Sequence, residues 1–317
     1  LLSLLLQELT GLSATWCIII GGVFVAVYTI IGGIDAVIWT DVMQTVVLVL
    51  GGILCLWMIV DALPGGMGQI FDVAGQFNKL SFSVLENGNL NAMGWEIRFD
   101  EKTISMMLFI GLIAWLTEYS SNQNTVQRYC ASKSTYEARK AMLVAVLSSL
   151  PIWAFYMFLG TALFVFFQQF PAVAPQEMLD GSRAPEQILP YFINNHLPAG
   201  VAGLVIASAM AAAMSSLDSS INAISTVSVV DIYRRHLKPG LDDKHYLKAA
   251  WVIAAISAVL MIGGAVYLAN AETKTLQDTA TILSSILGGG LLGLYLIGFF
   301  TKQGDARAAW AGLAATM

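Results

Sequence analysis

"ASAMAAAMSSLDSSINAIST", residues 207–226, places polar side chains in the middle of a long apolar segment. On a helix, one face would hold the i, i+3, i+4 and i+7 residues Ser215, Asp218, Ser219 and Asn222. Hydroxyl and carboxylate oxygens are ligands that hard cations accept. A carboxylate near the middle of a membrane is costly and normally faces an interior pathway. The stretch therefore favours a cation or proton site, although close packing of small residues is an alternative.

The composition of the whole chain indicates a polytopic membrane protein. Of its 317 residues, 57% are hydrophobic and 12% are charged, whereas soluble domains carry about a quarter of charged residues. Several apolar runs approach the ~20 residues that cross a bilayer. The fold class we expect is all-α, a bundle of membrane helices. The apolar runs that predict its helices are 15–31, 36–60, 104–119, 141–167, 201–230, 249–268 and 281–300.

Basic residues predict the orientation of these helices. They gather in the segments 128–140, 234–248 and 302–307, and they are sparse in the alternate connections. Cytoplasmic loops carry an excess of Lys and Arg, so these basic segments are predicted to be cytoplasmic and the loops at about 64–102 and 168–198 extracellular. Both ends of the chain fall inside apolar runs. We expect residues 1–317 to form a single transmembrane domain truncated at both ends.

Two more stretches place polar groups at membrane depth. In "LTEYSSNQNTVQRY", Leu116–Tyr129, a span that begins at Ile104 turns polar before it is complete. This pattern is typical of a membrane helix that breaks partway, and the alternative is a helix that ends at Tyr119. In "IWTDVMQTVVLVL", Asp41 lies within two turns of a predicted helix start. It is either part of a buried site or a carboxylate that favours the positive end of the helix dipole.

Long ordered motifs resemble the sodium/solute symporter family. They are "YTIIGGIDAVIWTDVMQTVVLVLGG", "NQNTVQRY", "GTALFVFFQQFP" and "LPAGVAGLVIASAMAAAMSSLDSSINAISTVSVVDIYRR". The likeness covers nearly the whole chain, and two of the motifs are most similar to the bacterial sialic acid branch. The resemblance implies a LeuT-type fold of two inverted five-helix repeats with broken helices. It also implies that the first two core helices lie outside this chain.

The resemblance also implies two sodium sites and a substrate gate. The shared site would use the carbonyl of Ala212 with Ser215 and Ser216, and the second site would use Asp41, Ser215, Asp218 and Ser219. Serine is expected where Asp218 stands, so the ion stoichiometry, or the use of a proton, stays open. Tyr119 resembles the aromatic inner gate. Its neighbours Glu118, Asn122 and Gln123 would line the substrate pocket or its exit.

The expected function is sodium-coupled symport of a small organic solute, such as a sugar or sialic acid, by alternating access. The alternatives are a symporter-like membrane sensor in a signalling protein and a helix bundle without ion binding. The resemblance implies a transporter rather than an enzyme, with no cofactor other than sodium as coupling ion. The implied partners are the solute, sodium and the lipid bilayer, without nucleic acid. We expect a monomer that crosses the inner (plasma) membrane several times.

Overall fold

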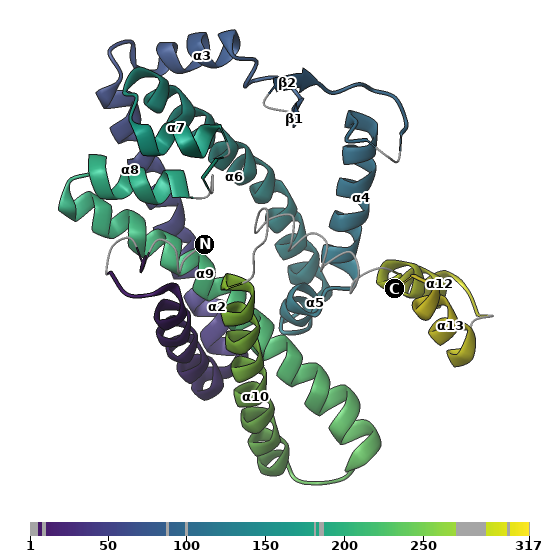
Figure 1. Cartoon of the computed structure of the whole chain (residues 1–317). Helices are drawn as coiled ribbons and strands as arrows, with labels where there is room; N and C mark the ends of the chain where they lie inside the picture. The colour runs from purple at the N-terminus through teal and green to yellow at the C-terminus, as the bar shows by residue number, and fades with distance from the viewer. Residues whose placement is uncertain are drawn as a thin grey trace. The chain divides into compact units, whose positions relative to one another are not determined.

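The computed structural model describes residues 6–7, 11–86, 89–98, 101–180, 182–183, 187–270, 290–302 and 305–316. Helices dominate this part of the chain (Figure 1). In chain order the elements are α2 (Ala14–Ala62), α3 (Gly66–Gln76), β1 (Ser83–Glu86), β2 (Asn89–Ala92), α4 (Ile104–Ser120), α5 (Gln123–Cys130), α6 (Thr135–Gln169), α7 (Val173–Leu179), α8 (Ile188–His196), α9 (Ala199–Thr226), the π-helix η2 (Val227–Leu237), α10 (Asp243–Ala269), α12 (Leu291–Phe300) and α13 (Ala306–Thr316).

Helix α2 consists of two consecutive helical limbs. Its 49 residues would extend ~74 Å at ~1.5 Å per residue, more than twice the ~30 Å of a hydrocarbon core. The helical path is interrupted at Gly33, whose φ of 59° and ψ of −153° lie outside the helical region. Glycine adopts such a positive φ without a side-chain clash. The two predicted runs, 15–31 and 36–60, are therefore confirmed as the two limbs.

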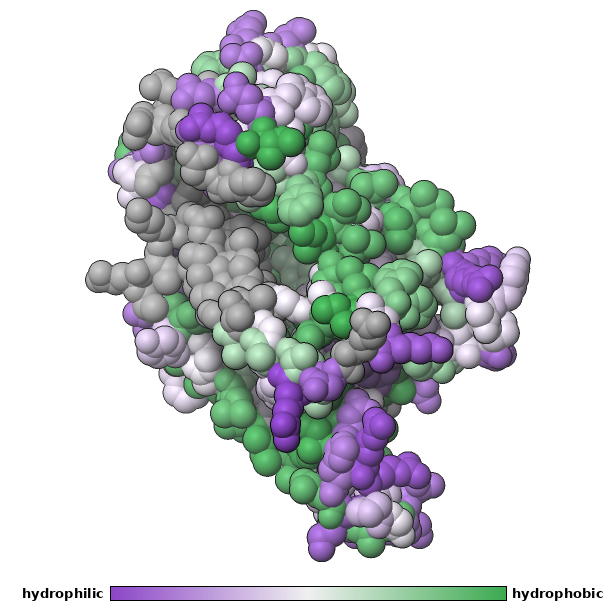
Figure 2. All heavy atoms as spheres, turned by 90° about the vertical axis from the view of Figure 1, so that its right-hand side faces the viewer, coloured by the Kyte–Doolittle hydropathy of each residue, from purple (hydrophilic) through white to green (hydrophobic). Residues whose placement is uncertain are grey.

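The long helices have the length and composition of membrane spans. In the described residues, four helical segments pass this test, namely α2, α6, α9 with η2 (Ala199–Leu237), and α10. The pair α4 and α5 adds a fifth if it is counted as one bent span. Large apolar side chains are exposed along these helices, and Figure 2 shows such residues gathered on one face. Exposed apolar surface of this extent is suited to lipid contact, so the chain is a multi-pass membrane protein.

The chain divides into two compact units. One comprises Leu1–Phe77 with Val146–Ala271, and the other Asn78–Ala145 with Glu272–Met317. The predicted single transmembrane domain stays a prediction. In the first unit α2 packs against α9, and α10 contacts both helices. In the second unit α12 contacts α4. Of the predicted span at 281–300, residues 281–289 lie outside the described residues, and the remainder contains α12.

The two predicted extracellular loops contain regular structure. The first contains α3 and the antiparallel hairpin of β1 and β2, in which Ser83 pairs with Ala92. The second contains α7 and α8. Buried aromatic and aliphatic residues from α8 pack with the ends of α2 and α6 in one cluster, which includes Ile59, Phe167 and Phe192. The hairpin in the first loop was not predicted from the sequence. The apolar cluster explains why the second loop is ordered.

Candidate functional site

The first candidate site lies between α2 and α9, where the sequence predicted a cation site. Asp41 belongs to the second limb of α2, and Ser215 belongs to α9. The Ser215 hydroxyl donates a hydrogen bond to Asp41 Oδ1 at 2.5 Å, although 174 residues separate them in sequence. The role of Asp41 is therefore not limited to an interaction with the positive end of the dipole of its own helix. The two residues form a polar contact between two predicted spans.

Asp218 lies one helical turn beyond Ser215 and is fully buried. The Tyr28 hydroxyl, from the first limb of α2, donates to Asp218 Oδ2 at 2.6 Å. The Thr40 hydroxyl, from the second limb, approaches the same oxygen at 3.4 Å. Within the described residues, Asp218 Oδ1 has no hydrogen-bond partner. A buried acceptor without a donor is costly, so this oxygen is suited to a ligand that supplies positive charge.

The remaining predicted sodium ligands lie on the same segment of α9. Ser219 is buried beside Asp218. Ser216 is exposed, and its hydroxyl donates to the carbonyl of Ala212 at 3.3 Å. The three residues predicted for the shared site, Ala212, Ser215 and Ser216, thus occupy about one turn of a single helix. Their assignment to a sodium ion stays a prediction.

The chemistry of this region is that of oxygen ligands. In the described part of the chain, no three His, Cys, Asp or Glu residues are grouped closely enough to hold a metal ion. Two carboxylates with hydroxyls between helices instead match the oxygen ligands that hard cations prefer. The site geometry is therefore compatible with a weakly held alkali cation rather than with a tightly bound transition metal.

The second candidate site is the predicted break in a membrane helix. Helix α4 ends at Ser120, α5 begins at Gln123, and the two are bent by 40°. Asn122 caps α5, because its side chain accepts from the Asn124 amide at 3.0 Å. The Glu118 carboxylate spans the break, accepting from Asn122 at 2.6 Å and from the Thr125 hydroxyl at 2.7 Å. The predicted break is confirmed, and the chain continues as a helix rather than as a loop.

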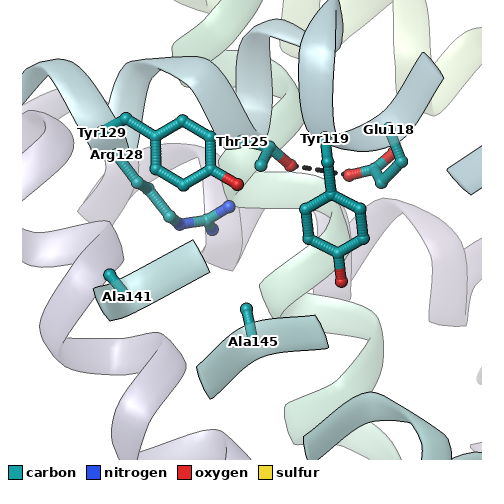
Figure 3. Close-up of a pocket in the computed structure, with 7 residues that line it drawn as sticks. All are labelled: Glu118, Tyr119, Thr125, Arg128, Tyr129, Ala141 and Ala145. Carbon is teal, nitrogen blue, oxygen red and sulfur yellow. Dashed lines mark hydrogen bonds between the residues drawn. The ribbon is translucent and has the colours of Figure 1, made fainter. Parts of the chain in front are cut away.

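A cavity of about 220 Å³ lies beside this break. In Figure 3 the rings of Tyr119 and Tyr129 border it from above, and two alanines of α6 lie below. Among the described residues, the buried Tyr129 hydroxyl has no hydrogen-bond partner. Of the predicted gate and substrate residues, Tyr119 and Glu118 line this cavity, whereas Asn122 and Gln123 do not. The complete lining is Glu118, Tyr119, Thr125, Arg128, Tyr129, Ala141 and Ala145.

Sequence reasoning missed several residues of both sites. Tyr28 and Thr40 contact Asp218, and Gln44 acts on Tyr28. Arg128 and Tyr129 line the cavity. Thr40 and Gln44 share a helix face with each other at i and i+4, next to Asp41, so their spacing was a usable signal. Tyr28 gave no local signal, because one tyrosine in an apolar run is common in membrane helices.

Comparisons with known proteins place these features in context. The profile of the Sodium:solute symporter family matches residues 3–315. The Sodium/sialic acid symporter SiaT of Proteus mirabilis is 31% identical over 312 residues, which cover 98% of this chain and 60% of that protein. The Sodium/sialic acid symporter NanT of Aliivibrio fischeri is 28% identical over 319 residues, covering 100% of this chain and 60% of the relative. The chain thus spans about 60% of the length of these relatives.

A solved structure has a similar fold. It shows the substrate-bound, outward-open state of a Na⁺-coupled sialic acid symporter in which a novel Na⁺ site was found. The similarity has a TM-score of 0.82 at 29% sequence identity, and it covers 99% of this chain and 61% of that chain. The predicted class of fold, a helical membrane bundle of the symporter type, is confirmed by this match.

Proposed function

We propose, because this chain belongs to the sodium:solute symporter family, that the full-length protein moves a small organic solute across the membrane together with sodium ions. The observation that carries this proposal is the contact between Asp41 and Ser215, with the buried Asp218 beside it. Oxygen ligands that join two spans can hold a cation in one conformation and release it when the helices move apart. Such a site couples ion binding to conformation.

The coupling we propose is alternating access. Sodium would bind at Ala212, Ser215 and Ser216, and a second cation at Asp41, Ser215, Asp218 and Ser219. A ligand shifts a conformational equilibrium only by its difference in affinity for the two states. Binding between α2 and α9 supplies that difference if only one state brings both helices to the ion. Each charge that moves through a potential of about 100 mV contributes about 2.3 kcal/mol to solute accumulation.

The cavity beside the helix break supports a role in solute passage. Tyr119 would act as the inner gate, and Glu118 would order the break through its bonds to Asn122 and Thr125. Gln123 at the start of α5 would contact the solute when the break opens. The cavity presents a carboxylate, a guanidinium and two phenols, which are hydrogen-bonding groups suited to a polar solute. We propose a sugar, with sialic acid as the first candidate because the similar proteins named above transport it.

The proposed location is the inner (plasma) membrane, where a sodium gradient is available, and the proposed active form is a monomer. Sodium, the solute and the lipid bilayer would be the partners. The similar proteins are transporters rather than sensors, so no observation favours the alternative of a signalling domain.

The test is uptake by the full-length protein in proteoliposomes with an inward sodium gradient. A panel of radiolabelled sugars and sialic acid identifies the solute, and potassium replaces sodium in the control. Ser215→Ala and Ser216→Ala should each raise the sodium concentration for half-maximal uptake by about tenfold, as expected for a lost ligand to a charged group. Ser149→Ala, which removes a hydroxyl bonded to its own helix carbonyl at 2.9 Å, is the control. Uptake that is equally fast without sodium would refute the proposal.

A further inference from the structure

Two buried oxygens without a hydrogen-bond partner lie next to Tyr28. Within the described residues, Asp218 Oδ1 and Gln44 Oε1 both lack a partner. The Tyr28 hydroxyl donates to Asp218 Oδ2 at 2.6 Å, and the Gln44 side chain is among the polar groups that act on Tyr28. Each of these oxygens can only accept. A hard cation satisfies several such oxygens at once, whereas a single donor satisfies one or two.

The surrounding contacts place the two carboxylates at the same level of the helix pair. Thr40 and Asp41 are adjacent on α2, and they contact Asp218 and Ser215, which are one turn apart on α9. The charges of Asp41 and Asp218 are close enough to interact. Two like charges in a poorly polar interior repel, and a cation bound between them removes that repulsion.

A carboxylate is longer than the serine that the family resemblance implies at position 218. If neither carboxylate oxygen of Asp218 were held by a hydrogen bond, the carboxylate could rotate toward either limb of α2. Tyr28 opposes this rotation because its hydroxyl donates a short hydrogen bond of 2.6 Å to Oδ2, and such a bond is strong when the carboxylate is ionised. Thr40 reaches the same oxygen from the other limb. The neighbouring Ser219 also acts on the Asp218 carboxylate from its amide and its hydroxyl. Within the described residues, Oδ1 is still the carboxylate oxygen without a hydrogen-bond partner.

We propose that Tyr28 is a positioning residue for cation coupling: it holds one oxygen of Asp218 so that the other completes a hard-cation site with Asp41 and Ser215. This inference rests on the proposed function, since the cation is the coupling ion of the transporter. The site selects small, hard monovalent cations, sodium or lithium, because carboxylate oxygens bind these more strongly than the larger potassium ion.

The experiment measures ion binding to the purified full-length protein in liposomes, with ²²Na⁺ as the probe and with lithium and potassium as competitors. Tyr28→Phe should raise the sodium concentration for half-saturation about tenfold, as expected for the loss of a charge-assisted hydrogen bond. Solute affinity at saturating sodium should change much less. Tyr156→Phe is the matched control, because the Tyr156 hydroxyl donates to a carbonyl of the same α2 helix, Leu48 O, at 2.8 Å. It should leave sodium binding unchanged.

A double-mutant comparison separates positioning from a general structural role. In an Asp218→Ser background, Tyr28 has lost its partner, so adding Tyr28→Phe should not change sodium binding further. Equal effects of Tyr28→Phe in both backgrounds would overturn the inference. If Tyr28→Phe does not fold, Thr40→Val provides a second test with a smaller expected rise, and no rise would count against the inference.

The outcome also distinguishes the inference from the function on which it rests. If Ser215→Ala weakens sodium binding while Tyr28→Phe leaves it at the wild-type value, the inference fails and the proposed function stands. If the wild-type protein binds no sodium and Ser215→Ala has no effect, both fail.

Discussion

Gly51 of α2 lies against Ser208 of α9 with no room for a side chain. A Cβ added at Gly51 would lie 2.3 Å from Ser208 Oγ and 2.5 Å from Ser208 Cβ. Carbon atoms in favourable contact are about 3.5–4.0 Å apart, so the helices would have to separate by about 1 Å. Ser208 cannot relieve the contact by turning its side chain, because its Cβ is attached directly to the backbone. The added methyl group must therefore displace one helix.

We expect Gly51→Ala to destabilise the protein by about 1–3 kcal/mol relative to a glycine-to-alanine change in open space, the usual cost of overpacking. Gly160→Ala in α6 is the matched control, because a Cβ there would meet no heavy atom within 4 Å. Both changes gain the same helix propensity, about 0.8–1.0 kcal/mol. The difference between the two variants then isolates the contact at Ser208.

The assay is reversible unfolding of the full-length protein in bicelles, followed by tryptophan fluorescence. Ser208→Gly, added to Gly51→Ala, should restore most of the lost stability, since it removes the two atoms that the new methyl group would meet at less than 3 Å. Because α2 and α9 also carry Asp41 and Ser215, the single variant should weaken sodium binding as well. If Gly51→Ala is as stable as Gly160→Ala, the close packing of α2 on α9 described above is incorrect.

Two other predictions concern local stability. The His196 ring stacks on Phe192 and contacts Phe166 edge-on, and partial burial lowers the pKa of His196 below its usual value. The unfolded chain therefore binds a proton at His196 more readily than the folded chain does. The thermal midpoint should fall as the pH drops below about 6.5, and His196→Gln should remove this part of the pH dependence. Asn122→Ala should cost about 1 kcal/mol through the lost cap of α5, and a thermal midpoint equal to that of the wild type would contradict this.

The helical spans could be predicted from the sequence because the bilayer imposes their length and composition. The apolar runs on either side of Gly33 correspond to the limbs of α2. The polar residues after Tyr119 marked the break, because backbone freed at membrane depth needs polar surroundings. At the start of α6 the Ser134 hydroxyl accepts from the Glu137 amide at 3.2 Å, a contact typical of serine three residues before glutamate.

The partners within the site could not be predicted in the same way. The contact of Tyr28 with Asp218 joins residues 190 positions apart, and local spacing carries no information on such a pairing. Asp41 and Ser215 were grouped in one predicted site through family resemblance, whereas their spacing alone left Asp41 open between two roles. The hairpin of β1 and β2 has no apolar alternation to reveal it, although the Asn-Gly dipeptide between its strands was a usable hairpin signal.

The turn at Gly33 has a consequence for biogenesis. Tyr28, before the turn, donates to Asp218 at 2.6 Å, and Thr40, after the turn, lies 3.4 Å from the same oxygen. Helix α9 is synthesised long after both limbs of α2. The Thr40 hydroxyl does not depend on α9, because the carbonyls of Ala36 and Val37 on its own helix lie at 2.9 and 3.0 Å. Asp41, by contrast, meets Ser215 only after α9 has been made, and a carboxylate in the bilayer is costly until then. We therefore expect the two limbs of newly inserted α2 to need an insertase that shields their polar groups until α9 is inserted.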